Sequence, residues 1–239
     1  MNHTRQTQHC IGLMVAAAVT VSAYSVTLSH SLHLYFALTV LALAAITSRM
    51  KVKLPGINGN MSVNLPFLLV AIVNLSAAEA VVITGISTLV QCWPKKGTNL
   101  KPEQMIFNLS MMTFATCLAS LVFRVASPGG AVWSMPLSLV LASATLLLGQ
   151  TMPVAAIVSI SEGKPTFPIF RNVVQLSFPY YVLSAGIVSM LEMVGSHMGW
   201  PLALGVFPVM YGIHASYRFY FSRMAEAGSA PALARAAHA

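Results

Sequence analysis

One carboxylate inside a long apolar stretch is the residue whose chemistry stands out first. Glu79 lies within the run Leu65–Trp93. A carboxylate at membrane depth costs roughly 2.5–3.5 kcal/mol on insertion scales, so it is normally paired or faces a cavity. Glu79 could therefore contact a ligand or exchange a proton. It also stands three residues after Ser76, and Ser-x-x-Glu is the pattern of a capping box, in which the carboxylate only accepts backbone hydrogen bonds.

Neutral polar side chains in or beside the apolar runs form a second group: Asn64, Asn74, Gln91, Asn108, Gln150 and Gln175. Our candidate ligand-binding residues are Glu79, Asn74, Asn108, Gln150, Gln175 and Tyr180. The amides could line a small-molecule pocket, or they could make hydrogen bonds between helices worth about 0.6–2 kcal/mol each. Tyr180 belongs to Phe178–Tyr181, which fits a ligand platform or an interfacial aromatic belt.

Motifs for catalysis and metal binding are absent from the sequence. It contains no HExxH, GxSxG or GxxxxGK[ST] pattern. It also contains no Asp, which excludes aspartyl catalytic pairs and the common carboxylate-rich metal clusters. His30, His33 and His197 fall on one predicted face, but short wet loops tolerate histidine without a metal. We expect a protein that is not an enzyme and holds no metal and no cofactor.

The composition is that of a chain embedded in a bilayer. Of 239 residues, 56% are hydrophobic and only 8% are charged, whereas about a quarter of a soluble domain is charged. The net charge of +8 comes from Lys and Arg that stand between apolar runs, without a basic stripe interleaved with aromatics. We therefore expect these basic residues to lie at the surface of the lipid bilayer, and we expect no binding of nucleic acid.

Seven apolar runs are long enough to matter: Ile11–Leu28, Leu32–Thr47, Leu65–Trp93, Met105–Phe123, Val132–Ile160, Val173–Met193 and Trp200–Phe221. They predict an all-α, polytopic transmembrane helix bundle with about six full spans plus a broken or re-entrant helix pair. The first run could instead be a cleaved signal peptide, because Val21–Ala23 resembles a cleavage site. We expect one transmembrane domain over residues 1–224 and a short flexible cytoplasmic tail over 225–239.

The third run is the one expected to break. As a single helix, Leu65–Trp93 would be about 43 Å long. The capping pattern at Ser76 predicts that the chain stops near Leu75 and restarts, forming two arms that enter and leave one face. With both termini cytoplasmic, this hairpin places every Lys and Arg except Arg124 inside, as the positive-inside rule favours. A single crossing would move five of the thirteen outside.

Several segments resemble the N-terminal membrane region of bacterial HD-GYP and GGDEF signalling proteins. They are Met105–Asn108 through Leu121–Arg124, Val154–Arg171, Phe178–Leu183 and Ala215–Met224, and the resemblance covers Leu32 to Met224. It implies a multi-pass sensor module in the bacterial cytoplasmic (inner) membrane, with a cytoplasmic signalling partner. The chain ends shortly after Met224 and carries no HD or GGDEF residues, so we do not expect a cyclic-dinucleotide enzyme.

A second, local resemblance leaves the function open between two classes. Met61–Pro66, followed by two short apolar arms, is similar to part of the S-components of ECF-type transporters, without the glycine-rich and acidic landmarks of that segment. Our leading expectation is a non-enzymatic, sensor-like membrane module that binds a small or lipophilic ligand or a partner protein. The alternative is a small-solute transporter or its substrate-binding subunit.

Overall fold

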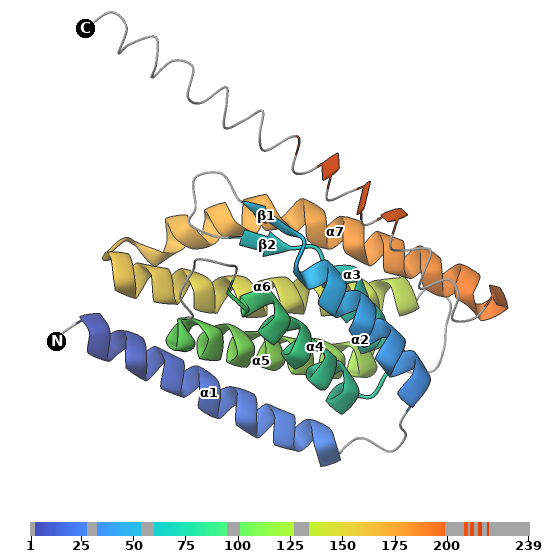
Figure 1. Cartoon of the computed structure of the whole chain (residues 1–239), viewed down its shortest axis with the longest axis horizontal. Helices are drawn as coiled ribbons and strands as arrows, with labels where there is room; N and C mark the ends of the chain where they lie inside the picture. Colours follow the sequence, from blue (N-terminus) through green and yellow to red (C-terminus); the bar gives the residue numbers. More distant parts are fainter. Residues whose placement is uncertain are drawn as a thin grey trace, which may run out of the picture.

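The chain folds into a bundle of helices in a computed structural model (Figure 1). The structure describes residues 3–27, 33–53, 60–94, 101–126 and 134–198, and residues 208, 209, 211, 212, 215, 216 and 219. Its helices are α1 (His3–Thr27), α2 (Leu34–Ser48), α3 (Leu65–Asn74), α4 (Ala77–Cys92), α5 (Pro102–Ala126), α6 (Ser134–Glu162) and α7 (Thr166–Met198). Two short strands, β1 (Lys51–Lys53) and β2 (Asn60–Ser62), pair antiparallel.

Four of these helices, α1, α5, α6 and α7, are long and apolar enough to cross a membrane. Each contains at least 23 residues that qualify, and about 20 are needed to cross the hydrocarbon core of a bilayer. Many of their large apolar side chains, such as Leu13, Val140 and Met190, are exposed on the surface of the bundle. The chain is therefore a helical membrane protein.

The expected count of about six full spans is wrong for the described part of the chain. The second expected span forms α2, whose 15 residues reach only about 22 Å. Most of the expected span Trp200–Phe221 and all of the tail 225–239 lie outside the described residues. The predicted all-α bundle is confirmed for the described part of the chain, where the connection after α2 adds only the short β1–β2 hairpin. Ser62 of this hairpin donates a hydrogen bond from its Oγ to the Ser48 carbonyl, over 3.3 Å.

The break in the third run is confirmed at the residue where it was expected. Helix α3 ends at Asn74, Leu75 and Ser76 have extended backbone conformations, and α4 starts at Ala77. The capping box is complete: the Ser76 side chain accepts from the Glu79 N–H, and the Glu79 carboxylate accepts from the Ser76 N–H. Arg124 of α5 donates to the Leu75 carbonyl, over 2.8 Å, and so binds the break to a long helix.

The two arms run antiparallel. Asn64, at the start of α3, lies 3.5 Å from Ser87 near the end of α4, measured from Nδ2 to Oγ. Helix α4 in turn runs antiparallel to α5, because Cys92 contacts Asn108 at one end and Leu75 contacts Arg124 at the other. The hairpin tip therefore lies at the level where α5 ends, about 24 Å of helix away from the Asn108 level.

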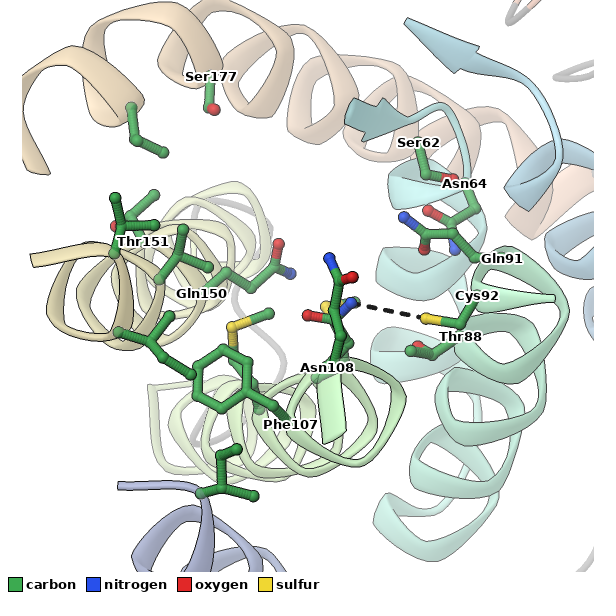
Figure 2. A pocket seen from close by; sticks show the side chains of 18 of the residues that line it. Ser62, Asn64, Thr88, Gln91, Cys92, Phe107, Asn108, Gln150, Thr151 and Ser177 are labelled. Carbon is green, nitrogen blue, oxygen red and sulfur yellow. Dashed lines mark hydrogen bonds between the residues drawn. The ribbon is translucent and has the colours of Figure 1, made fainter. Parts of the chain in front are cut away.

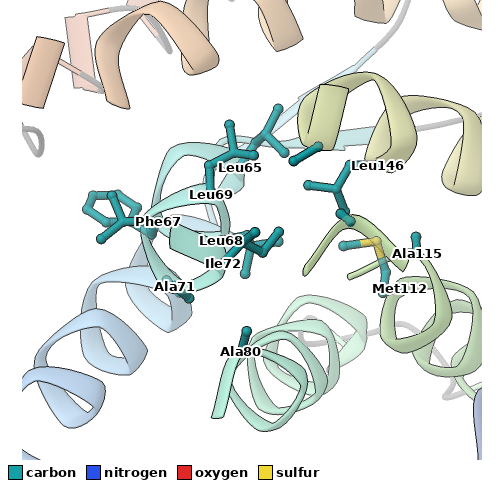
Figure 3. Packing of buried hydrophobic residues seen from close by; sticks show 14 of the residues in the cluster. Leu65, Phe67, Leu68, Leu69, Ala71, Ile72, Ala80, Met112, Ala115 and Leu146 are labelled. Atoms are coloured by element: carbon teal, nitrogen blue, oxygen red, sulfur yellow. The ribbon is translucent and has the colours of Figure 1, made fainter. Parts of the chain in front are cut away.

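Helix α3 is the centre of the core. Every residue from Leu65 to Ile72 is buried, because α3 is packed among α2, α4, α5 and α7. Figure 3 shows Phe67 and Ala71 pointing toward α2, and Leu68 and Ile72 pointing into the space between α4, α5 and α6. A helix that is apolar on all sides fits this enclosed position.

Basic residues gather at one end of the bundle, which we call the basic end. Here α1 begins, α2 and α4 end, α5 begins, and α6 turns into α7; Figure 1 shows the first and last of these features together on the left. Arg5, Arg49, Lys51, Lys101 and Lys164 belong to these segments. Arg49 donates to the carbonyls of Val90 and Trp93 and so completes the last turn of α4. The opposite, or far, end holds Leu75 and Arg124.

Candidate functional site

A cavity of about 630 Å³ opens into the bundle near the basic end (Figure 2). Its walls come from α1, α3, α4, α5, α6 and α7, with Ser62 and Asn64 just before α3. The polar lining consists of Thr7, Ser62, Asn64, Thr88, Gln91, Lys101, Glu103, Gln104, Asn108, Gln150, Thr151, Ser161, Ser177, Tyr180 and Tyr181. A volume of 300–1,000 Å³ is typical of small-molecule sites.

Four side-chain amides come together in this cavity. Figure 2 shows Asn108 between Gln150 on one side and Asn64 and Gln91 on the other. They come from four separate segments. Asn64 precedes α3, and Gln91 lies in the last turn of α4. Asn108 lies in the second turn of α5, and Gln150 in the middle of α6. The antiparallel α3–α4 hairpin is what brings Asn64 and Gln91 to the same level.

These amides use only part of their hydrogen-bonding capacity. Asn108 donates from Nδ2 to the Cys92 sulfur over 3.6 Å, a weak acceptor. Gln150 accepts from the Tyr181 hydroxyl over 2.6 Å, and its two N–H groups have no partner among the residues that the structure describes. Within the described part of the chain, the Gln91 side chain makes no hydrogen bond. Both donors and acceptors therefore remain available to a bound molecule.

A buried hydroxyl in the same wall also lacks a partner. Thr88 is 1% exposed, and its Oγ1 has no hydrogen-bond partner among the described residues. Leaving such a group unpaired costs about 1–3 kcal/mol. Thr88 lies one helical turn before Cys92 and next to it in Figure 2.

Aromatic and apolar side chains complete the site. Phe107, Leu68, Met111 and Met112 lie in the lining from α3 and α5. Tyr180 and Tyr181 meet edge to face, with ring centroids 6.3 Å apart. The Tyr180 hydroxyl accepts from the Leu65 N–H over 3.3 Å, so it caps an unpaired donor at the start of α3.

The described residues that line the interior of the cavity are uncharged. Lys101 and Glu103 are the lining residues that carry a full charge, and both are exposed, at the start of α5. Gln104 and Ser161 are exposed in the same region. These residues mark the mouth of the cavity at the basic end. Among the described residues, no group of three or more His, Cys, Asp or Glu side chains could hold a metal ion.

The structure separates the six candidate residues into two sets. Asn108, Gln150 and Tyr180 line the cavity together. Gln175 is exposed and Asn74 donates to the Val70 carbonyl and to Glu192 of α7, so neither lines the cavity. Asn74 thus makes the interhelical hydrogen bond that was the alternative for this group.

Glu79 also lies outside the cavity, at the far end. Its Oε2 accepts from the N–H and the hydroxyl of Ser76, at 2.9 and 2.7 Å, and its Oε1 accepts from the His33 N–H at 3.0 Å. The carboxylate is thus occupied by the capping box and by the residue that precedes α2. Its contacts fit the capping interpretation and include no group from the cavity.

Several lining residues were outside our candidate set. Asn64 and Gln91 were grouped with the polar residues but not selected, Tyr181 was noted only as part of Phe178–Tyr181, and Thr88 and Phe107 were not considered as ligand contacts. A periodic signal was present on α4, where Thr84, Ser87, Thr88 and Gln91 follow the i, i+3, i+4, i+7 spacing of one helix face.

Comparison of the chain with protein-family models, curated proteins and solved structures finds no match. The cavity is therefore the feature from which a function can be inferred.

Proposed function

We propose that this protein is a non-enzymatic, sensor-like membrane module that binds a small molecule in the amide-lined cavity. One observation carries the proposal: a cavity open at the basic end, in which Gln91, Asn108 and Gln150 retain hydrogen-bonding groups that no described residue uses. Thr88 in the same lining is buried and has no partner among the described residues, whereas buried polar groups in folded proteins are nearly always satisfied. A ligand with matching donors and acceptors would satisfy them.

The chemistry of the lining favours binding over catalysis. Among the described lining residues there is no histidine, and the one carboxylate, Glu103, is exposed at the mouth. A nucleophile paired with a base, or two facing acids, would be needed for the common hydrolytic mechanisms.

The orientation belongs to the same proposal. We infer that the basic end faces the cytoplasm of a bacterial inner membrane, because Lys and Arg concentrate on cytoplasmic loops. The cavity mouth then faces the cytoplasm, where a signalling partner could respond to its occupancy. The cytoplasmic placement of the C-terminus depends on the apolar run Trp200–Phe221, most of which lies outside the described residues.

Native mass spectrometry of the detergent-purified protein tests the binding proposal. We expect a co-purifying adduct on the unmodified chain and on Gln175→Leu, whose side chain is exposed and away from the cavity. The adduct should be lost from Asn108→Leu, which replaces the central amide with an apolar group of similar size. An adduct that survives in Asn108→Leu, or absence of any bound molecule in all three proteins, would contradict the proposal.

Transport of a small solute is the second candidate. It is favoured by the position of the broken pair, because Asn64, Leu65 and Gln91 of that pair line the cavity. Interrupted helices form the substrate sites of many transporters. Uptake of the identified ligand into proteoliposomes would support transport, whereas binding without uptake would support the sensor.

A further inference from the structure

We propose that the ligand is an uncharged, planar molecule with an amide-type edge, such as a lactam, a carboxamide or a nucleobase-like ring, and that it reaches the cavity from the basic end. This inference rests on the proposed binding function and names the chemical class that the site would take. Four amides around the cavity, apolar and aromatic side chains in the same lining, and a mouth lined by exposed polar groups support this inference.

The neutral interior excludes ionic ligands on energetic grounds. The charged lining side chains, Lys101 and Glu103, lie at the mouth and have opposite signs. A charge transferred into a low-dielectric interior without a partner costs several kcal/mol. A carboxylate or ammonium ligand would find no deep countercharge in this cavity.

The polar wall selects a ligand that both donates and accepts. Each Asn or Gln side chain carries a carbonyl acceptor and two N–H donors in one plane. Gln150 has its oxygen committed to Tyr181 and presents its N–H groups, whereas Gln91 presents both kinds of group. A carboxamide, a lactam or a nucleobase edge has the same planar pairing of donor and acceptor, so it can satisfy neighbouring amides at once.

The apolar residues of the lining suit a ligand whose ring is flat and apolar. Phe107 and Leu68 are almost fully buried and line the cavity with Met111 and Met112. Methionine side chains adapt to ligand shape and make favourable contacts with aromatic rings. A hydrocarbon ligand could contact these apolar residues, but it would leave the amides and the Thr88 hydroxyl without hydrogen bonds.

A native cysteine allows a direct test. Cys92 lines the cavity, whereas Cys10 and Cys117 do not. In a Cys10→Ser, Cys117→Ala background of the full chain, the rate at which N-methylmaleimide labels Cys92 reports on occupancy. A competing ligand at twice its Kd slows this labelling about threefold.

Matched probes at millimolar concentration separate the ligand classes. We expect benzamide, nicotinamide and uracil to slow labelling about threefold, and benzoate and benzylamine to have no effect. If ethylbenzene or benzoate protects Cys92 and the amides do not, the cavity binds a ligand of another class, and only this inference fails. If no probe protects and no co-purifying molecule is found, the binding function itself fails.

Two variants, each compared with its own ligand-free rate, keep the test specific. Asn108→Leu and Gln91→Leu each remove one amide, and both should abolish protection by benzamide. Gln175→Leu, outside the cavity, should keep it. Full protection by benzamide in both cavity variants would overturn the assignment of the amide wall.

Discussion

At the residue scale, Thr88 offers a clean test because its hydroxyl is buried and unpaired among the described residues. Replacing Thr88 with Val removes the hydroxyl and keeps the shape. Since an unpaired polar group costs about 1–3 kcal/mol, we expect Thr88→Val to leave the ligand-free protein equally or more stable. Thermal unfolding in detergent measures this change.

The control residue is Thr84, one turn earlier on the same helix. Its Oγ1 accepts from the Thr116 hydroxyl over 3.1 Å, and both residues are fully buried. Thr84→Val leaves Thr116 without this acceptor on α4, so we expect a loss of about 1 kcal/mol. Equal destabilisation by Thr84→Val and Thr88→Val would mean that Thr88 has a partner in the folded protein.

Residue types alone could not decide which polar groups face the cavity. On α7, Val173, Ser177, Tyr180 and Tyr181 line it, and they follow one helix face. Gln175 is two positions from Val173, or about 200° around the helix, and therefore points away. Selecting residues by polarity within apolar runs included Gln175 and omitted Thr88, because it ignored the rotation of each helix.

At the element scale, Glu79 joins the starts of α2 and α4. Its two carboxylate oxygens accept three hydrogen bonds, from His33 and Ser76. In Glu79→Gln, one oxygen becomes an NH2 group that must face a donor. We expect a loss of about 1–3 kcal/mol, larger than that of Ser76→Ala, and no change in probe protection at Cys92.

Thermal unfolding and the Cys92 labelling assay distinguish the two roles of Glu79. Ser76→Ala keeps the carboxylate and its bonds to the backbone N–H groups of Ser76 and His33. Loss of benzamide protection in Glu79→Gln, with Ser76→Ala retaining it, would connect the far end to the cavity. Our interpretation of Glu79 as a capping residue would then be wrong.

The contact between α5 and α6 depends on one glycine. A Cβ added at Gly149 would lie 2.9 Å from the Ala115 Cβ and 3.2 Å from its Cα, which is backbone. Small residues allow such close approach between membrane helices. We expect Gly149→Ala to cost about 1–3 kcal/mol in thermal or denaturant unfolding, because the two helices must separate.

Gly186, on α7, is the matched control for that substitution. No atom outside its own helix neighbourhood lies within 4 Å of an added Cβ. Alanine there should be neutral or stabilise the helix by up to about 1 kcal/mol. Similar losses from Gly149→Ala and Gly186→Ala would contradict the packing explanation.

The sequence predicted the helix break at Leu75 but not the short α2 or the β1–β2 hairpin, because only the break has a local signal. The break at Leu75 was predictable because the Ser76–Glu79 capping box is a local signal. The shortness of α2 and the β1–β2 hairpin depend on contacts between distant segments, such as Ser62 with Ser48 and Arg49 with Val90. No local pattern encodes those contacts.

At the scale of the whole molecule, the distribution of basic residues predicts the orientation in the membrane and therefore the side to which the cavity opens. Arg5, Lys101 and Lys164 lie at the end where the cavity opens, and Arg124 lies at the other. If the basic end is cytoplasmic, the ligand comes from the cytoplasm, which suits a sensor of a cellular metabolite. If it is external, the same cavity would suit uptake.

Two positions report the orientation in a variant without native cysteines. Lys164 lies in the exposed turn between α6 and α7, and Thr27 is exposed at the far end of α1. We expect Lys164→Cys to react with a membrane-impermeant maleimide in inverted vesicles, and Thr27→Cys to react in intact cells whose outer membrane is permeabilised. Reporter fusions before Arg5 and after Arg235 should both indicate the cytoplasm.

Because the positive-inside rule acts on loop charges near the ends of the spans, the reversed labelling pattern would show that these charges do not determine orientation here. The cavity would then open outward, and transport would replace sensing as the better proposal.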